Sequence, residues 1–224
     1  MANELNYYLI PGMGADKRLF QNFHLPKGRV HHLDWIKHGN SSNLAEYASL
    51  MADRITTKRN IVIGSSMGGM VTVEIAKIIK PLGAVLVSAP SGRHEFPQSL
   101  KSLSKLRLHR ALNPKQVMKV SKLCDLFMGF KSREQRAMFY DMLENNGADF
   151  LHFSVGAVLE WSNTTPPPVP FIQILGSNDK LFNQSKIRNA IMLDGSGHFT
   201  AFERGAEVSK IITEWSAQFE SPSE

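Results

Sequence analysis

Three residues of this sequence, a serine, an aspartate and a histidine, have side chains that can together carry out nucleophilic catalysis. Ser66 is the centre of the segment GSSMG at residues 64–68, which fits the pattern G-x-S-x-G in one frame only. Asp179 and His198 lie in two later turns with the sequences GSND and DGSGHF. A serine hydroxyl attacks a carbonyl carbon when a histidine takes its proton and an acid orients that histidine. The chemistry that these residue types could perform is therefore acyl transfer.

Ser66 stands between two segments whose hydrophobic patterns predict a strand and a helix. Residues 61–63 are a short β-branched run, and residues 70–79 carry apolar side chains at helical spacing. A G-x-S-x-G turn in this context is too tight for side chains at its flanking positions, so the serine is strained and its hydroxyl projects above the sheet edge. The first N–H groups of the helix point at the same place. The alternative is a plain glycine–serine turn without a catalytic role. The later turns that carry Asp179 and His198 argue against this alternative.

Asp179 and His198 each follow a predicted strand, which gives the order Ser, Asp, His along the chain. This order resembles the α/β-hydrolase superfamily and differs from the orders of the chymotrypsin and subtilisin types. The segments that carry the resemblance are GSSMGG, LGSND, GSGHF and the early IPGMG, and it covers almost the whole chain. The most similar members are small capped carboxylesterases and acyl-carrier-protein ester hydrolases.

The resemblance implies a role for each of five residues. Ser66 would be the nucleophile, His198 the general base and Asp179 the acid that orients the histidine. The backbone N–H groups of Met13 and Met67 would form the oxyanion hole. Family members often have His-Gly in the early loop where this chain has Pro-Gly, so the Met13 assignment departs from the usual pattern. The resemblance implies no metal and no organic cofactor.

The chain is expected to adopt an α/β-hydrolase fold of class α/β. Because many family members carry two further antiparallel strands and little chain precedes residue 5 here, we expect a minimal, mostly parallel sheet of about six strands, with helices on both faces. The expected strands are 5–10, 29–35, 61–63, 83–88, 169–175 and 190–193. The expected core helices are 17–22, capped by Asp16, 43–56, capped by Ser41 or Ser42, 70–80 and 205–219.

Residues 92–168 depart from the alternation of strands and helices. They are polar, with helical patterns at 97–112, 114–128, 132–145 and 150–161. The resemblance implies that they form an inserted helical cap over the serine, so residues 1–91 and 169–224 would be the two parts of the hydrolase core, in one domain overall. Most apolar cap residues should hold its helices together, and the candidates for lining a pocket are Leu103, Leu106, Phe127, Met128, Phe130, Met138, Phe139 and Phe153.

The predicted cap also carries most of the positive charge. Residues 92–124 have a formal charge of +7, while the whole chain has +6. The plain interpretation is a solvated helix face. The sharper one is a docking surface for an acidic acyl carrier protein or a phosphate-bearing substrate. Nucleic acid is not expected, because no binding motif accompanies the charge. The basic residues are Arg93, Lys101, Lys105, Arg107, Arg110, Lys115, Lys119 and Lys122.

Composition fits one soluble domain. The chain has 224 residues, 42% of them hydrophobic, and no apolar run as long as a membrane span. No secretory signal peptide is recognised. A single cysteine, Cys124, excludes an intrachain disulfide and is expected as a buried apolar residue. We therefore expect a cytoplasmic protein. His31 and His32 are adjacent on a predicted strand and point oppositely, which argues against a metal site.

These observations predict a serine hydrolase that cleaves a carboxylic ester or thioester of a small or medium acyl substrate through an acyl-enzyme. One alternative is a lyase or a C–C bond hydrolase that uses the same triad, because one fold hosts many reactions. Another is a non-catalytic, ligand-binding member of the fold. An intact Ser66, Asp179 and His198 disfavours the binding protein, which would need none of them for turnover.

Overall fold

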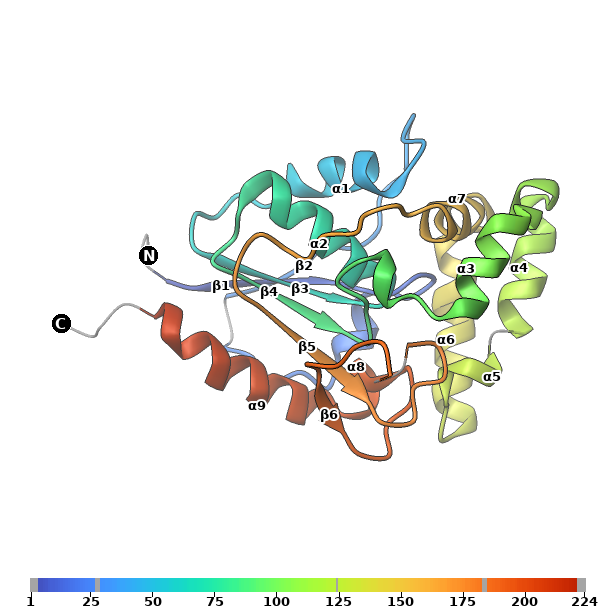
Figure 1. The fold of residues 1–224 in the computed structure, drawn as a ribbon. Coiled ribbons are helices and arrows are strands. Elements are labelled where there is room, and N and C mark those ends of the chain that lie inside the picture. Colours follow the sequence, from blue (N-terminus) through green and yellow to red (C-terminus); the bar gives the residue numbers. More distant parts are fainter. Residues whose placement is uncertain (1–3, 27–28, 124, 183–184, 221–224) are drawn as a thin grey trace.

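Six parallel strands form a single sheet in the order β2-β1-β3-β4-β5-β6 (Figure 1). The computed structural model describes residues 4–26, 29–123, 125–182 and 185–220, so the predicted burial of Cys124 lies outside the described residues. The expected α/β fold with a minimal parallel sheet is confirmed. The strands are β1 (Asn6–Ile10), β2 (Val30–His32), β3 (Asn60–Ser65), β4 (Gly83–Val87), β5 (Phe171–Gly176) and β6 (Ile191–Leu193).

Both faces of the sheet are covered, because alternate side chains along each strand enter two separate hydrophobic clusters. On β1, Tyr7 and Leu9 belong to one cluster, and Tyr8 and Ile10 to the other. The cluster of Tyr8 packs against α1 (Leu44–Ala52) and α2 (Met67–Ile79). The cluster of Tyr7 packs against α9 (Gly205–Ser216), on the opposite face (Figure 1). The sheet is therefore a rigid base from which the loops after its strands project.

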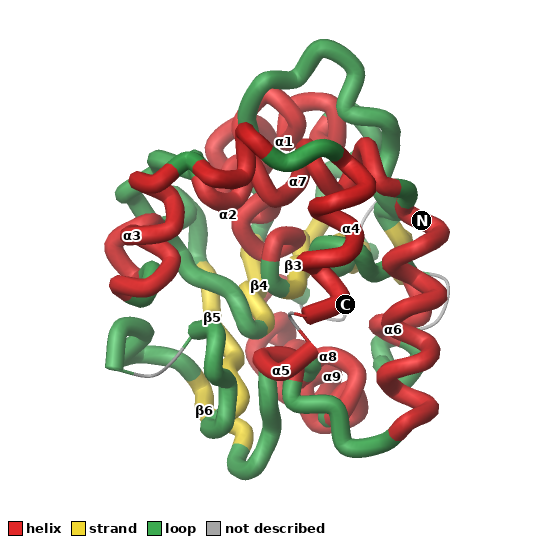
Figure 2. The backbone as a smooth tube through the Cα atoms, turned by 90° about the vertical axis from the view of Figure 1, so that its right-hand side faces the viewer, coloured by secondary structure: helices red, strands yellow, loops and turns green. Residues whose placement is uncertain are grey.

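The chain between β4 and β5 forms helices beyond the carboxyl ends of the strands (Figures 1 and 2). Arg107 has a left-handed backbone with φ 50°, which ends the first helix, so the single helix predicted over 97–112 is wrong. The segment predicted as a helix over 114–128 is helical on both sides of residue 124, which lies outside the described residues. The elements are η2 (Arg93–Glu95), α3 (Gln98–Leu106), η3 (Leu108–Ala111), α4 (Pro114–Leu123), α5 (Asp125–Met128), α6 (Arg133–Asn146) and α7 (Ala148–Leu159).

Both ends of this helical segment are fixed to the core by polar contacts. Arg93 lies near the start of the segment, and its guanidinium donates to two carbonyls near the end of the segment. These are the carbonyls of Leu159, at 3.0 Å, and Trp161, at 2.7 Å. The Trp161 indole in turn donates to Glu74 Oε1 of α2 at 2.7 Å. The first and last residues of the segment are thus tied to each other and to the helix that follows Ser66.

Smaller differences concern the ends of elements. Asn43, not Ser41 or Ser42, caps α1 by accepting from the N–H of Glu46. Asp16 caps η1 (Lys17–Phe20) as predicted. The predicted last helix is confirmed in α9, which the short helices α8 (Thr200–Glu203) and η4 (Ala217–Phe219) flank.

Candidate active site

Ser66 lies in the turn that joins β3 to α2, with φ 53° and ψ −118°. A positive φ is strained for a serine, and two glycines let the turn close. A Cβ on Gly64 would come within 2.1 Å of the Gly68 carbonyl oxygen, and one on Gly68 within 2.3 Å of the Pro11 oxygen. Neither distance allows a side chain. This geometry is that of the nucleophile elbow that the GSSMG sequence predicts.

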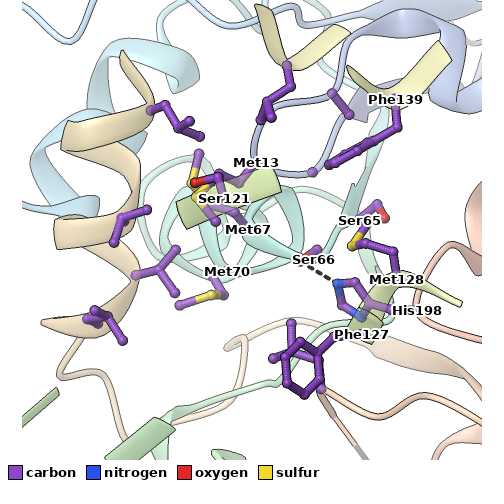
Figure 3. A pocket seen from close by; sticks show the side chains of 18 of the residues that line it. Met13, Ser65, Ser66, Met67, Met70, Ser121, Phe127, Met128, Phe139 and His198 are labelled. Carbon is purple, nitrogen blue, oxygen red and sulfur yellow. Dashed lines mark hydrogen bonds between the residues drawn. The ribbon is translucent and has the colours of Figure 1, made fainter. Parts of the chain in front are cut away.

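His198 joins Ser66 to Asp179 through hydrogen bonds at both of its ring nitrogens. Its Nε2 lies 2.9 Å from the Ser66 Oγ (Figure 3), and its Nδ1 lies 2.9 Å from Asp179 Oδ2. A carboxylate accepts and cannot donate, so Asp179 holds the proton on Nδ1 and leaves the Nε2 lone pair facing the serine hydroxyl. The three side chains that the sequence predicts as a triad are brought together in that order.

Backbone donors hold Asp179 in place. Its Oδ1 accepts from the N–H groups of Leu181, at 2.8 Å, and Phe182, at 2.9 Å, so its two oxygens have separate tasks. The Asp179 side chain is fully buried, and that of His198 is 3% exposed. The ring of Phe182 packs against the imidazole with centroids 5.8 Å apart. The pair is therefore shielded from water, and the hydrogen bond to the serine is correspondingly strong.

Glu203 supports the turn that carries His198, and the sequence analysis missed it. Its Oε2 accepts from the Ser196 hydroxyl at 2.8 Å and from the Gly197 N–H at 3.4 Å. Lys131 Nζ lies 3.5 Å from the same oxygen, and the Glu203 side chain is only 2% exposed. The glutamate follows the histidine by five residues, and no motif marks it, because its partners are set by how α8 folds back on the turn.

Two backbone N–H groups lie near the serine where an oxyanion hole is predicted. Met67 is the first residue of α2, so its N–H has no partner within the helix. Met13 lies in the loop after β1 and lines the same cavity as Ser66 and Met67 (Figure 3). Gly12 brings this loop close to the serine, since a Cβ on Gly12 would be 3.4 Å from the Ser66 Cβ.

An apolar cavity of about 250 Å³ opens beside the serine. Among the described lining residues, the polar side chains are Ser65, Ser66, Ser121 and His198. Four of the residues predicted to line a pocket do so, namely Leu103, Phe127, Met128 and Phe139. The other four do not. Leu106 is 65% exposed, Phe153 stacks on His38, and Phe130 and Met138 pack against the core cluster.

Within the described ranges, no group of three or more His, Cys, Asp or Glu side chains is placed to bind a metal ion. His31 instead bonds to Asn6 Oδ1 at 2.9 Å and stacks on Tyr8. None of the helices in the described part of the chain is long and apolar enough to span a membrane.

The sheet order and the serine, histidine and aspartate beyond its carboxyl edge define the class of α/β hydrolases. A model of the Alpha/beta hydrolase family matches residues 8–211, and the chain belongs to this family. A comparison with curated proteins found no match.

Solved structures with the same fold include an esterase and a thioesterase. MenH from S. aureus is 17% identical with a TM-score of 0.77, covering 99% of this chain and 96% of its own. A thermophilic esterase from Thermogutta terrifontis is 13% identical with a TM-score of 0.74, covering 99% and 92%. A type II thioesterase of the yersiniabactin pathway is 15% identical with a TM-score of 0.65, covering 96% and 92%. At these identities the likeness shows the fold alone.

Proposed function

We propose that this protein is a serine hydrolase that cleaves a carboxylic ester or thioester of a small or medium acyl substrate. The observation that carries the proposal is the chain of hydrogen bonds from Asp179 through His198 to Ser66, at 2.9 Å each, at the wall of an apolar cavity. Esterases and thioesterases among proteins of the same fold support the same reaction type.

The proposed reaction has two steps through an acyl-enzyme. His198 Nε2 takes the Ser66 proton while Oγ attacks the carbonyl carbon, and the N–H groups of Met13 and Met67 bind the oxygen as its charge develops. His198 then gives the proton to the leaving alcohol or thiol as the bond to the carbonyl carbon breaks. Water attacks the acyl-enzyme with His198 as base, and the acid leaves. Asp179 keeps the imidazole oriented and stabilises its charged form in both steps.

The cavity suggests the acyl part of the substrate. Its lining contains no Asp, Glu, Lys or Arg among the described residues, so an anionic or cationic acyl group would lose its hydration without a partner. Its volume of about 250 Å³ is just below the range of about 300–1,000 Å³ for pockets that take drug-sized ligands. We propose that α3–α7 act as the cap and that the cavity holds a short or medium apolar acyl chain.

An acyl carrier protein is the proposed bearer of the thioester. Of the eight basic residues predicted as a docking surface, four bond to carbonyls or carboxylates of this chain, namely Arg93, Lys101, Arg110 and Lys122. The exposed cations that suit an acidic partner are Lys105, Arg107, Lys115 and Lys119, on α3, α4 and the turn between them. Leu103 and Val120 lie on the same two helices, line the cavity and are 42% and 47% exposed, so this surface borders the cavity.

Hydrolysis of p-nitrophenyl esters of increasing chain length tests the proposal. We expect kcat/KM to peak at short or medium chains and Ser66→Ala to abolish turnover. Phe139→Ala enlarges the cavity and should move the peak to longer chains, whereas Met138→Ala, on the same helix but outside the lining, should not. Turnover of carbonyl or cyanohydrin substrates without ester hydrolysis would favour the lyase, and saturable binding without any turnover would favour a binding protein.

A further inference from the structure

The carbonyl of Gly12, in the loop beside Ser66, accepts two hydrogen bonds. The Trp35 indole Nε1–H donates to it at 3.1 Å, and the backbone N–H of Ala15 donates at 3.0 Å. This carbonyl belongs to the same peptide group as the N–H of Met13. In a trans peptide the C=O and N–H bonds point in opposite directions. Donors that hold the carbonyl therefore also set the direction of the Met13 N–H.

Trp35 is itself held from two sides. Next to it, the Tyr47 hydroxyl accepts from the Ile36 N–H and donates to the Ile36 carbonyl, both at 3.0 Å. Burial raises the pKa of Tyr47 to about 12, so this hydroxyl keeps its proton at neutral pH. The Trp35 ring also packs on Phe150 of α7, with centroids 5.5 Å apart. The indole is thus fixed by α1 and by a helix above the cavity.

We propose that Trp35 is a positioning residue of the oxyanion hole. Its indole N–H holds the Gly12–Met13 peptide so that the Met13 N–H faces the carbonyl oxygen of an acyl group on Ser66. This inference rests on the proposed function, because it concerns a charge that forms only during acyl transfer. It also links α7 to catalysis, since the contact with Phe150 makes the orientation of the oxyanion loop depend on how α7 sits on the core.

The variant Trp35→Phe tests this role, because it keeps an aromatic ring and removes the N–H donor. We expect kcat for the best p-nitrophenyl ester to fall about tenfold, as for the loss of one hydrogen bond, while KM changes less than about twofold. An alkyl trifluoromethyl ketone adds to the serine as a hemiketal anion that resembles the transition state. Its inhibition constant should rise by about the same tenfold factor as kcat falls.

Trp161→Phe is the matched control, because it removes another indole hydrogen bond, of 2.7 Å to Glu74, outside the cavity lining. It should leave the inhibition constant within about twofold of wild type. The proposal is overturned if Trp35→Phe binds the ketone as tightly as wild type, or if only KM changes. If the wild-type protein shows no Ser66-dependent turnover, the proposed function is refuted instead. The two failures are therefore distinguishable.

Hydrogen exchange of the indole N–H groups keeps the proposal testable if Trp35→Phe does not fold. The chain has three tryptophans, so Trp161→Phe and Trp215→Phe assign the Trp35 resonance by elimination. We expect slow exchange in the free protein and slower exchange with the ketone bound. Fast exchange, at the rate of a solvent-exposed indole, would show that the Gly12 carbonyl has lost this donor and would refute the proposal.

Discussion

His198 receives its orientation from two directions, and only one of them is the aspartate. Asp179 fixes the ring through Nδ1 at 2.9 Å, and Glu203 fixes the backbone turn through Ser196 and Gly197. The aspartate controls which nitrogen carries the proton, whereas the glutamate controls where the ring stands relative to Ser66. A small shift of a catalytic group can cost a large factor in rate.

Glu203→Ala tests whether the glutamate fixes the turn that carries His198. It leaves the Gly197 N–H without this acceptor and the buried Ser196 hydroxyl with only the Thr200 hydroxyl, 3.1 Å away, so we expect a loss of about 1–3 kcal/mol in the free energy of unfolding. We also expect a lower kcat, because the turn that carries His198 loosens. Glu203→Gln keeps an acceptor oxygen and should retain most of both quantities. Urea unfolding and ester turnover measure the two effects, and wild-type kcat in the alanine variant would contradict this role.

At this scale the sequence predicts the residues that sit in local motifs and misses those whose partners are distant. Ser66, Asp179 and His198 each follow a strand in a short glycine-containing turn, so pattern alone marks them. Trp35 and Glu203 sit in no motif. Their roles depend on contacts such as the one between Trp35 and Gly12, 23 residues apart, which no local pattern encodes.

At the scale of elements, the turn after β3 is tightly packed and α3, between β4 and β5, is loosely packed. The elbow is closed by backbone contacts at Gly64 and Gly68 that admit no side chain. In contrast, α3 buries none of its residues fully. Elements with few buried contacts open at low free-energy cost. The structure thus combines a tightly packed nucleophile turn with one lightly packed helix in the pocket wall.

One ion-pair cluster ties η3 to the end of α7. Glu160 accepts from Arg110 at 2.7 and 2.9 Å and from His109 Nε2 at 2.8 Å. The hydrogen bonds from Arg110 lower the pKa of Glu160 from 4.5 to about 2, with burial opposing and His109 assisting. Because the pKa is lower in the folded state, the ionised carboxylate stabilises the fold above pH 4.5, and this contribution is lost as the pH falls toward 2.

Glu160→Gln should therefore lower Tm at pH 7, by about 2–4 °C at most because the pair is partly exposed. The difference in Tm from wild type should shrink as the pH falls below 4.5, where the stabilisation of the fold by the Glu160 carboxylate begins to decrease. Melting curves of both proteins from pH 3.5 to 7 measure this. Asp53→Asn, at an exposed carboxylate directly after α1, is the control. A Tm difference for Glu160→Gln that grows toward acid would contradict the sign.

The strands of the sheet are recognisable in the sequence, whereas the boundaries of the helices above them are less so. Short runs of mostly buried apolar residues mark β1, β3, β4 and β5 in the sequence. In the helical segment, Arg107 adopts φ 50° without a glycine or proline to signal the break. The amphipathic pattern continues across it, so a single helix is predicted where two exist.

At the scale of the whole molecule, the excess of positive charge lies on the helices that border the cavity. The exposed cations of α4, Lys115 and Lys119, face solvent, and no acidic residue occurs between residues 96 and 124. A one-signed surface at a cavity mouth raises the association rate of an oppositely charged partner and does so less at high salt. The charge thus favours an acidic carrier over a neutral ester.

Lys115→Glu/Lys119→Glu tests the carrier-protein proposal. We expect kcat/KM toward an acyl carrier protein thioester to fall about tenfold or more at low ionic strength. The difference should be smaller at about 0.5 M salt, because salt screens surface charges and the Debye length is already only about 8 Å at about 0.15 M. Lys58→Glu/Lys210→Glu, at two exposed lysines before β3 and on α9, is the matched control with the same change of charge elsewhere. Equal effects of the two variants would show that net charge, not this surface, governs the encounter.

The most direct test of the account is covalent labelling by an alkyl fluorophosphonate, with the labelled peptide located by mass spectrometry. An activated serine displaces fluoride, so the account predicts one phosphonyl group on Ser66 in wild type and none on folded Ser66→Ala. Asp179→Asn should be labelled much more slowly, because the histidine then loses the tautomer that accepts the serine proton. A folded wild-type protein that stays unlabelled, or a label on another residue, would contradict the claim that Ser66 is the nucleophile.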